Sequence, residues 1–254
     1  MTGRERLLAI VGGVTAGFFG GLFGVGGGLV LIPLLTATLH FTQHEAHATS
    51  LAVIVFTAIA AGTVYALHGN VSWSTGIIAG VASMLTAPLG ARLAYKLSSR
   101  ALRRAFAVFM LLLALRLLWQ PPHPTSEIVG FTRIALVVVV GAVTGVVSGF
   151  MGIGGGTIMV PAFTLVLGFT QQLAQGTSLL AIVGAATAGS WQHRKKGTVR
   201  AAFVPWIALG SVVAGPAVSV VVQQLPHDVL VRGFALFLIA NGVYGLVGPD
   251  PKRR

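Results

Sequence analysis

Long apolar stretches separated by short polar segments run along almost the whole chain. They lie at approximately 7–40, 45–67, 71–95, 102–119, 133–167, 177–193, 201–223 and 229–247. A hydrocarbon layer about 30 Å thick needs about 20 apolar residues of helix to cross it. The ten-residue alternation that is typical of a membrane β-barrel is not found. The pattern therefore predicts an all-α, polytopic helical membrane protein.

Two of these stretches, 7–40 and 133–167, are too long for one membrane helix. The first would extend about 51 Å at 1.5 Å per residue if it were helical throughout. Each contains a glycine cluster, Gly24–Gly28 or Gly152–Gly156, and then a proline. Because glycine and proline both disfavour a continuous helix, we predict two helical pieces joined by a non-helical break in each stretch.

The chain is duplicated at a fixed offset of 128 residues. GFFGGLFGVGGGLVLIP, which starts at Gly17, is matched by GVVSGFMGIGGGTIMVP, which starts at Gly145 (145 − 17 = 128). FTQHEAHATSL and FTQQLAQGTSL follow at the same offset, with seven of eleven positions identical. Duplicated apolar units with interrupted helices are typical of secondary transporters whose site lies between the repeats. The predicted units are repeat one at 1–119, a linker at 120–132 and repeat two at 133–254.

The distribution of lysine and arginine favours an inverted arrangement of the two repeats. If each long stretch is a hairpin that returns to its own side, 14 of the 17 Lys and Arg residues fall on the side of the N-terminus. If each stretch crosses once, the split becomes 11 to 6. Short cytoplasmic loops are enriched in Lys and Arg. We therefore predict inverted topology with both termini in the cytoplasm, in a bacterial-type inner or plasma membrane.

Composition narrows the classes of partner. Charged residues make up 9% of the chain and hydrophobic residues 55%, against about 25% charged residues in an average soluble domain. A net charge of +12 would suggest nucleic acid in a soluble protein. Here the basic clusters lie between apolar stretches, which is typical of the positive-inside rule and of contact with anionic lipid. We expect membrane lipid as a partner and no nucleic acid; a homo-oligomer stays open.

The two glycine clusters are the strongest candidate for a binding site. An unsatisfied amide in hydrocarbon costs several kcal/mol, so each break must face protein or a wet cavity. A short helix that starts at Leu29 or Thr157 would turn free N–H groups and its positive dipole end toward an anion. The alternative is close helix packing through small residues. The glycines predicted to bind substrate are Gly26, Gly27, Gly28, Gly154, Gly155 and Gly156.

Polar residues that recur in both halves are further candidates for substrate binding. Thr49-Ser50 and Thr177-Ser178 open the next apolar helix of each repeat, and Gln43 and Gln171 recur at the same offset. The hydroxyls could cap a helix or bond to its backbone, and they could equally donate to an oxyanion. We include all six residues in the predicted substrate site and leave both interpretations of the hydroxyls open.

No residue pattern points to catalysis. His44-Glu45-Ala46-His47 has the spacing HExH, whereas HExxH places two histidines on one helical face. The acidic residues lie in loops or near the ends of apolar stretches: Glu5, Glu45, Glu127, Asp228 and Asp250. Cation sites and proton relays usually need a carboxylate within the membrane, so cation transport is disfavoured. We expect no enzymatic activity, no metal and no cofactor.

Taken together, the motifs resemble the TauE/SafE sulfite exporter family of membrane permeases. The matching pieces of the first half are GGLFGVGGGLVLIPLL, A-x-A-T-S-L, H-G-N-V-S-W and A-P-L-G-A-R-L-A followed by LRRAF. The second half gives GFMGIGGGTIMVPAF, A-x-G-T-S-L and K-K-G-T-V. The resemblance covers nearly the whole chain. It implies movement of small sulfur oxyanions and organosulfonates through a fold with about eight spans.

We therefore predict a secondary transporter of a small anionic substrate that works by alternating access between the two repeats. No nucleotide-binding motif is present, so ATP is not expected to drive it. Export of sulfite, an organosulfonate or a related oxyanion is the first hypothesis. The alternatives are uptake of the same anions and a non-transporting membrane scaffold.

Overall fold

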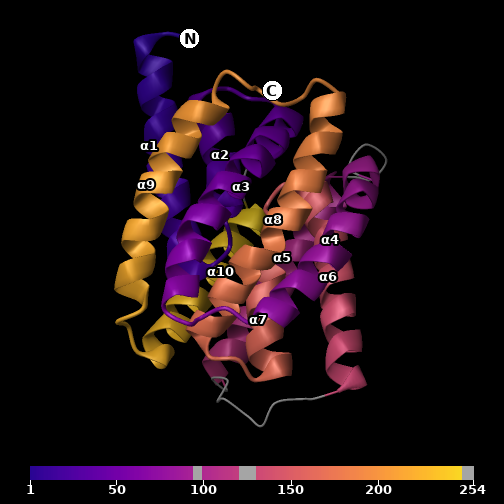
Figure 1. Cartoon of the computed structure of the whole chain (residues 1–254). Coiled ribbons are helices and arrows are strands. Elements are labelled where there is room, and N and C mark those ends of the chain that lie inside the picture. The colour runs from indigo at the N-terminus through magenta and orange to yellow at the C-terminus, as the bar shows by residue number, and fades with distance from the viewer. Residues whose placement is uncertain (94–98, 120–129, 248–254) are drawn as a thin grey trace.

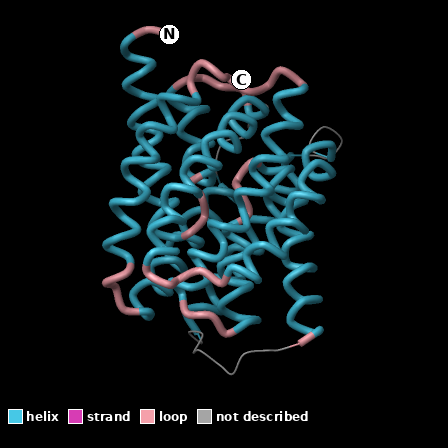
Figure 2. Tube along the Cα trace, viewed as in Figure 1, coloured by secondary structure: helices cyan, strands magenta, loops and turns pink. Residues whose placement is uncertain are grey.

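The computed structural model describes residues 1–93, 99–119 and 130–247, and these residues form helices joined by short turns, without a strand (Figures 1 and 2). The helices are α1 (Gly3–Phe23), α2 (Gly28–Thr38), α3 (Gln43–Leu67), α4 (Trp73–Leu93), α5 (Ser99–Trp119), α6 (Phe131–Met151), α7 (Gly156–Leu167), α8 (Gln171–Lys195), α9 (Val204–Val222) and α10 (His227–Val247). The predicted all-α fold is confirmed.

The helix surfaces are those of a membrane protein. By length and composition, six of the described helices could cross a membrane: α1, α3, α4, α6, α9 and α10. In α1 the large apolar side chains of Leu7, Val11 and Phe18 are exposed, whereas Gly13 and Gly17 are buried. Large apolar groups outside and small residues at helix contacts are the arrangement that a hydrocarbon solvent favours. The chain is therefore an integral membrane protein.

The repeat seen in the sequence is also present in the helices. The bounds of α1 and α6, of α3 and α8, and of α5 and α10 each differ by 128 residues. Both predicted breaks are present as well. One separates α1 from α2 and the other separates α6 from α7, and Figure 2 shows both as loop segments within the bundle.

The two broken stretches enter the bundle from opposite ends. The start of α1, the α2–α3 turn and the α8–α9 loop lie at the top of Figure 1. The α3–α4, α7–α8 and α9–α10 turns lie at the bottom of the same view. The α1–α2 hairpin therefore opens toward one end and the α6–α7 hairpin toward the other. The predicted inverted arrangement is confirmed.

Basic residues gather at the end where α1 begins, which we call the basic end. Arg4 and Arg6 lie in the first turn of α1, Arg92 lies in the last turn of α4, and a basic cluster ends α8. That cluster is followed by Arg200 in the α8–α9 loop. Part of the charge prediction, including Lys96 and the basic C-terminus, lies outside the described residues.

Helices of one half pack against helices of the other half. Helix α1 lies along α9, α6 along α4, α3 against α8, and α5 against α10. Small residues permit the closest contacts: a Cβ on Gly17 would lie 2.7 Å from Ser211 Cα, and one on Gly145 would lie 2.7 Å from Ser83 Cα. The helices of the two predicted units, 1–119 and 133–254, thus interlock. Most of the predicted linker, 120–132, lies outside the described residues.

Candidate functional site

Each break is built from glycines in the left-handed region of backbone conformation. The φ angles are +68°, +73° and +81° at Gly24, Gly26 and Gly27, and +70°, +80° and +85° at the residues 128 positions later. Only glycine adopts this region readily. Gly24 and Gly152 are the C-caps of α1 and α6, and Gly27 and Gly155 are the N-caps of α2 and α7. The short helices begin at Gly28 and Gly156, one residue before the predicted starts.

Neither short helix is capped by a side chain. Their N-caps are Gly27 and Gly155, which offer no side-chain acceptor to the first amides. The N-cap carbonyls accept from the amides of the second turn, for example from Leu31 N at 3.0 Å and from Met159 N at 3.1 Å. The first amides of α2 and α7, together with the positive ends of the helix dipoles, are thus available to a negatively charged group.

The two breaks meet inside the bundle. A Cβ on Gly28 would lie 3.0 Å from Ile153 Cα in the second break, and one on Gly156 would lie 2.5 Å from Val25 Cα in the first. Ile54 of α3 and Ile182 of α8 both flank the glycine at the centre of each break. The six predicted glycines therefore lie around the pseudo-two-fold axis that relates the repeats.

Ser50 and Ser178 lie against these glycines. The Oγ atom of Ser50 would be 3.0 Å from a Cβ on Gly28, and that of Ser178 would be 3.2 Å from a Cβ on Gly156. Ser178 Oγ donates to Gly24 O at 3.0 Å, whereas Ser50 Oγ is buried without a hydrogen-bond partner. Both hydroxyls therefore line the place where the breaks meet, and one of them is unsatisfied.

Thr49 and Thr177 each hydrogen bond to a loop of the other half. Thr49 Oγ1 accepts from Arg200 N at 3.1 Å, and Thr177 Oγ1 accepts from Ser72 N at 2.9 Å. The suggestion that these hydroxyls cap a helix is wrong, because the N-caps of α3 and α8 are Thr42 and Thr170. Their role in substrate binding stays a prediction.

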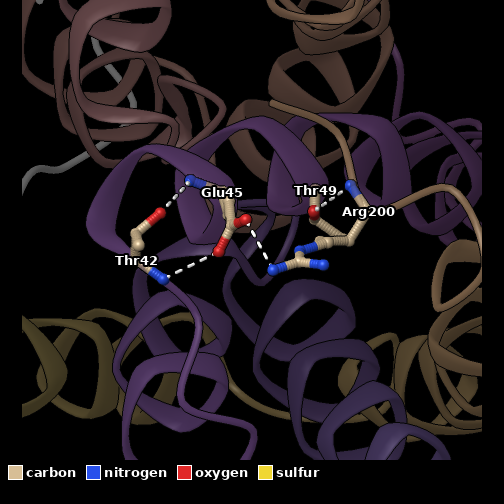
Figure 3. Close-up of polar contacts among 4 residues, drawn as sticks. All are labelled: Thr42, Glu45, Thr49 and Arg200. Atoms are coloured by element: carbon tan, nitrogen blue, oxygen red, sulfur yellow. Dashed lines mark hydrogen bonds and ion pairs between the residues drawn. The ribbon is translucent and has the colours of Figure 1, made fainter. Parts of the chain in front are cut away.

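The start of α3 is tied further to the α8–α9 loop, as Figure 3 shows. Thr42 and Glu45 form a capping box, and Glu45 Oε1 also lies 2.8 Å from the guanidinium of Arg200. The position equivalent to Arg200 in the first repeat is Ser72, and that equivalent to Glu45 in the second is Leu173. At both ends a loop amide thus donates a hydrogen bond to a threonine hydroxyl. Only the basic end adds the ion pair between Glu45 and Arg200.

Gln43 and Gln171 lie at the helix starts rather than at the breaks. Gln43 Nε2 is 3.0 Å from His47 Nε2. The side chain of Gln171 is buried, and neither its Oε1 nor its Nε2 has a hydrogen-bond partner. The pair therefore does not join the glycines, and its part in binding stays a prediction.

Four further buried polar residues were missed by the sequence interpretation. Thr144 and Ser148 of α6, Thr157 of α7 and Gln175 of α8 each have a side-chain atom without a hydrogen-bond partner. A Cβ on Gly155 would contact Thr144 and Ser148, so both lie beside the second break. Burying an unsatisfied hydroxyl or amide costs about 1–3 kcal/mol. Their helical spacing of four residues could have identified Thr144 and Ser148 as facing α7.

Among the described residues, the groups placed at the breaks are hydrogen-bond donors: hydroxyls, the Gln175 amide and helix amides. The carboxylate of α3, Glu45, is paired with Arg200. In the described ranges, no group of three or more His, Cys, Asp or Glu could hold a metal ion. Such a site can bind a small oxyanion by neutral donors and helix dipoles.

Two helix breaks that meet between inverted repeats define a secondary-transporter architecture. The chain belongs to the TauE/SafE sulfite exporter family, because the family model described as "Sulfite exporter TauE/SafE" matches residues 2–117 and 137–254. The family resemblance seen in the motifs is thereby confirmed.

Relatives from two organisms agree with this assignment. The chain is 27% identical to "Probable membrane transporter protein YunE" of Bacillus subtilis, over 93% of this chain and 95% of that protein. It is 29% identical to a "Probable membrane transporter protein" of Haemophilus influenzae, over 93% and 96%. The family and these relatives are described as membrane transporters and not as enzymes. No solved structure matches the chain significantly.

Proposed function

We propose that the protein is a secondary transporter that exports small sulfur oxyanions, such as sulfite or an organosulfonate, by alternating access. The substrate binds where the glycine breaks of α1–α2 and α6–α7 meet, and the two repeats open that place to either side in turn. The substrate must be small because the breaks approach each other closely around Gly28 and Gly156. Membership of the TauE/SafE family supports the choice of sulfur oxyanions.

The observation that carries this proposal is the set of unsatisfied donors beside two uncapped helix starts. Ser50, Thr144, Ser148 and Thr157 are buried hydroxyl residues without a hydrogen-bond partner, and they lie on the elements that form or flank the breaks. A bound oxyanion can accept from such hydroxyls and from the first amides of α2 and α7. Binding therefore offsets the cost of burying them.

The charge distribution supports an orientation with the basic end in the cytoplasm. Short cytoplasmic loops are enriched in Lys and Arg. The basic end is where α1 begins and where α8 finishes with His193, Arg194 and Lys195. In a bacterial-type inner membrane the inside-negative potential then favours outward movement of an anion. The bias is about 2.3 kcal/mol per charge per 100 mV.

The test is flux through purified protein in liposomes. Vesicles loaded with methanesulfonate, whose charge is fixed at neutral pH, are given a potassium diffusion potential with valinomycin. We expect efflux above that of protein-free vesicles, faster when the lumen is negative, and competition by sulfite. A flux that ignores both voltage and anion would contradict the proposal. A preference for inward movement at matched gradients would favour uptake.

A further inference from the structure

The two ends of the molecule carry different residues at equivalent positions beside the breaks. The offset of 128 residues places His193 at the position of Tyr65, and Gln175 at the position of His47. A Cβ on Gly24 would lie 2.6 Å from Gln175 Cα, and one on Gly152 would lie 2.7 Å from His47 Cα. The first glycine of each break thus lies against the backbone of Gln175 or of His47.

Away from the basic end, the pair is Tyr65 and Gln175. Tyr65 Oη donates to Gly21 O at 2.8 Å, in the last turn of α1, and lies 3.0 Å from Gln175 Oε1. Neither a phenol nor an amide changes charge near neutral pH. This pair therefore holds the end of α1 in a way that does not depend on pH.

At the basic end, two histidines hold the end of α6 in the same manner. His193 Nε2 lies 3.4 Å from Gly149 O, which is the counterpart of Gly21 O, and His47 hydrogen bonds to the backbone of Phe150. Both imidazoles therefore lie at the C-terminal end of α6, where helix carbonyls favour a positive charge. Imidazole changes its charge between about pH 5 and 8.

A line of histidines leads from the surface to this pair. His44 is exposed, His47 is partly buried and His193 is buried. His193 and His44 both act electrostatically on His47, and His44 also acts on His193. Two adjacent imidazoles repel each other once both are charged. The pair can therefore hold one proton more readily than two.

Resting on the proposed transport function, we propose that His47 and His193 bind one proton and that this binding favours opening of the basic end. Taking a charge out of water is costly, so the protonated pair favours an arrangement in which water reaches it. A ligand that prefers one of two states shifts the equilibrium toward that state. The Tyr65–Gln175 pair, which occupies the equivalent positions, takes up no proton in this pH range.

The contact between Gln43 and His47 gives this response a local mechanism. The amide nitrogen of Gln43 faces His47 Nε2 at 3.0 Å, so the imidazole nitrogen is the acceptor in this arrangement. When Nε2 receives a proton it becomes a donor, and Gln43 must turn its Oε1 toward it. Protonation therefore reorients the Gln43 side chain in the first turn of α3, one turn before Thr49 and Ser50.

The charged side chains described as acting on this pair are positive. From the elements packed around it, α6 contributes backbone carbonyls, α3 contributes His44, and the end of α8 contributes Lys196, which acts on His193. Glu45, the carboxylate on the same turn of α3, is paired with Arg200. Positive neighbours limit the pair to a single proton and strengthen the drive toward hydration.

The chain offers matched variants, because each pair can be exchanged for its counterpart. H47Q/H193Y places the pH-insensitive pair at the basic end. Ser50 is buried beside Gly28 on the same helix as His47, so Ser50→Cys reports opening of the basic end when an impermeant maleimide is added from that side alone. The chain has no native cysteine, and labelling of the exposed Lys195→Cys corrects for the pH dependence of thiol chemistry.

We expect the corrected labelling rate of Ser50→Cys to rise about five-fold or more from pH 8 to pH 6, and to stay flat in H47Q/H193Y. Methanesulfonate flux should follow the same pattern, with wild-type and double-variant rates within about two-fold of each other at pH 8. An equal pH response in both backgrounds would overturn the proton site. Labelling needs no transport, so a protein without anion flux would refute the proposed function while still testing this inference.

Discussion

The α1–α2 and α6–α7 hairpins have the same backbone and different polar groups. Along α6 and at the start of α7, the residues facing the second break are Thr144, Ser148 and Thr157. Their counterparts 128 positions earlier are Ala16, Gly20 and Leu29. The geometry of a helix break was thus retained in both copies, and hydroxyl donors are present in one. From this comparison we propose that the second hairpin supplies most of the donors to the anion.

The largest expected effect comes from adding a methyl group to the N-cap glycines. Gly27→Ala would drive its Cβ into the carbonyl of Ala16, and Gly155→Ala would drive it into the side-chain methyl of Thr144. A left-handed conformation costs a residue with a Cβ about 1–2 kcal/mol before any clash. Both variants should therefore lose several degrees or more in thermal unfolding measured in detergent.

The two variants should differ in whether they can be rescued. Thr144→Ala removes the obstructing methyl and should restore much of the stability lost in Gly155→Ala. Gly27→Ala meets backbone, so a side-chain change at position 16, already alanine, offers no relief. If Thr144→Ala failed to rescue Gly155→Ala, or rescued Gly27→Ala equally well, the hairpins would not be packed as described.

A smaller effect is expected from removing one hydroxyl of the second hairpin. Thr157→Val keeps the shape and deletes a donor beside the first amides of α7. A hydrogen bond to a charged group contributes about 1.5–3 kcal/mol, so KM for anion flux should rise about ten-fold or more. The matched change Leu29→Val in the first hairpin should leave KM unchanged. Similar effects at both positions would refute the asymmetric site.

Much of this fold could be predicted because it follows from patterns along the chain. Apolar stretches of membrane length, the offset of 128 residues and the glycine clusters gave the helices, the repeat and the breaks. The excess of Lys and Arg near Arg4, Arg92 and Arg194 gave the inverted arrangement. These patterns can be recognised in the sequence without knowing which residues of the two repeats are in contact.

The site was predicted less completely because its partners come from different repeats. Adjacent residues on a helix point about 100° apart, and the sequence could not tell which hydroxyl of Thr49-Ser50 faces the break. His47 was considered with its neighbours in one HExH segment, whereas a charge that acts on it comes from His193 in the other repeat. Applying the repeat offset to polar residues that differ between the halves would have revealed both the histidine pair and the hydroxyls of α6.

The most direct test of the inverted arrangement uses equivalent residues at the ends of two equivalent helices. Leu67 ends α3 and Lys195 ends α8, 128 residues later, and both are exposed. In a chain without native cysteine, Leu67→Cys and Lys195→Cys each carry a single thiol for a membrane-impermeant maleimide. We predict that the reagent reaches one thiol from outside oriented vesicles and the other from inside alone. Labelling of both from the same side would contradict it.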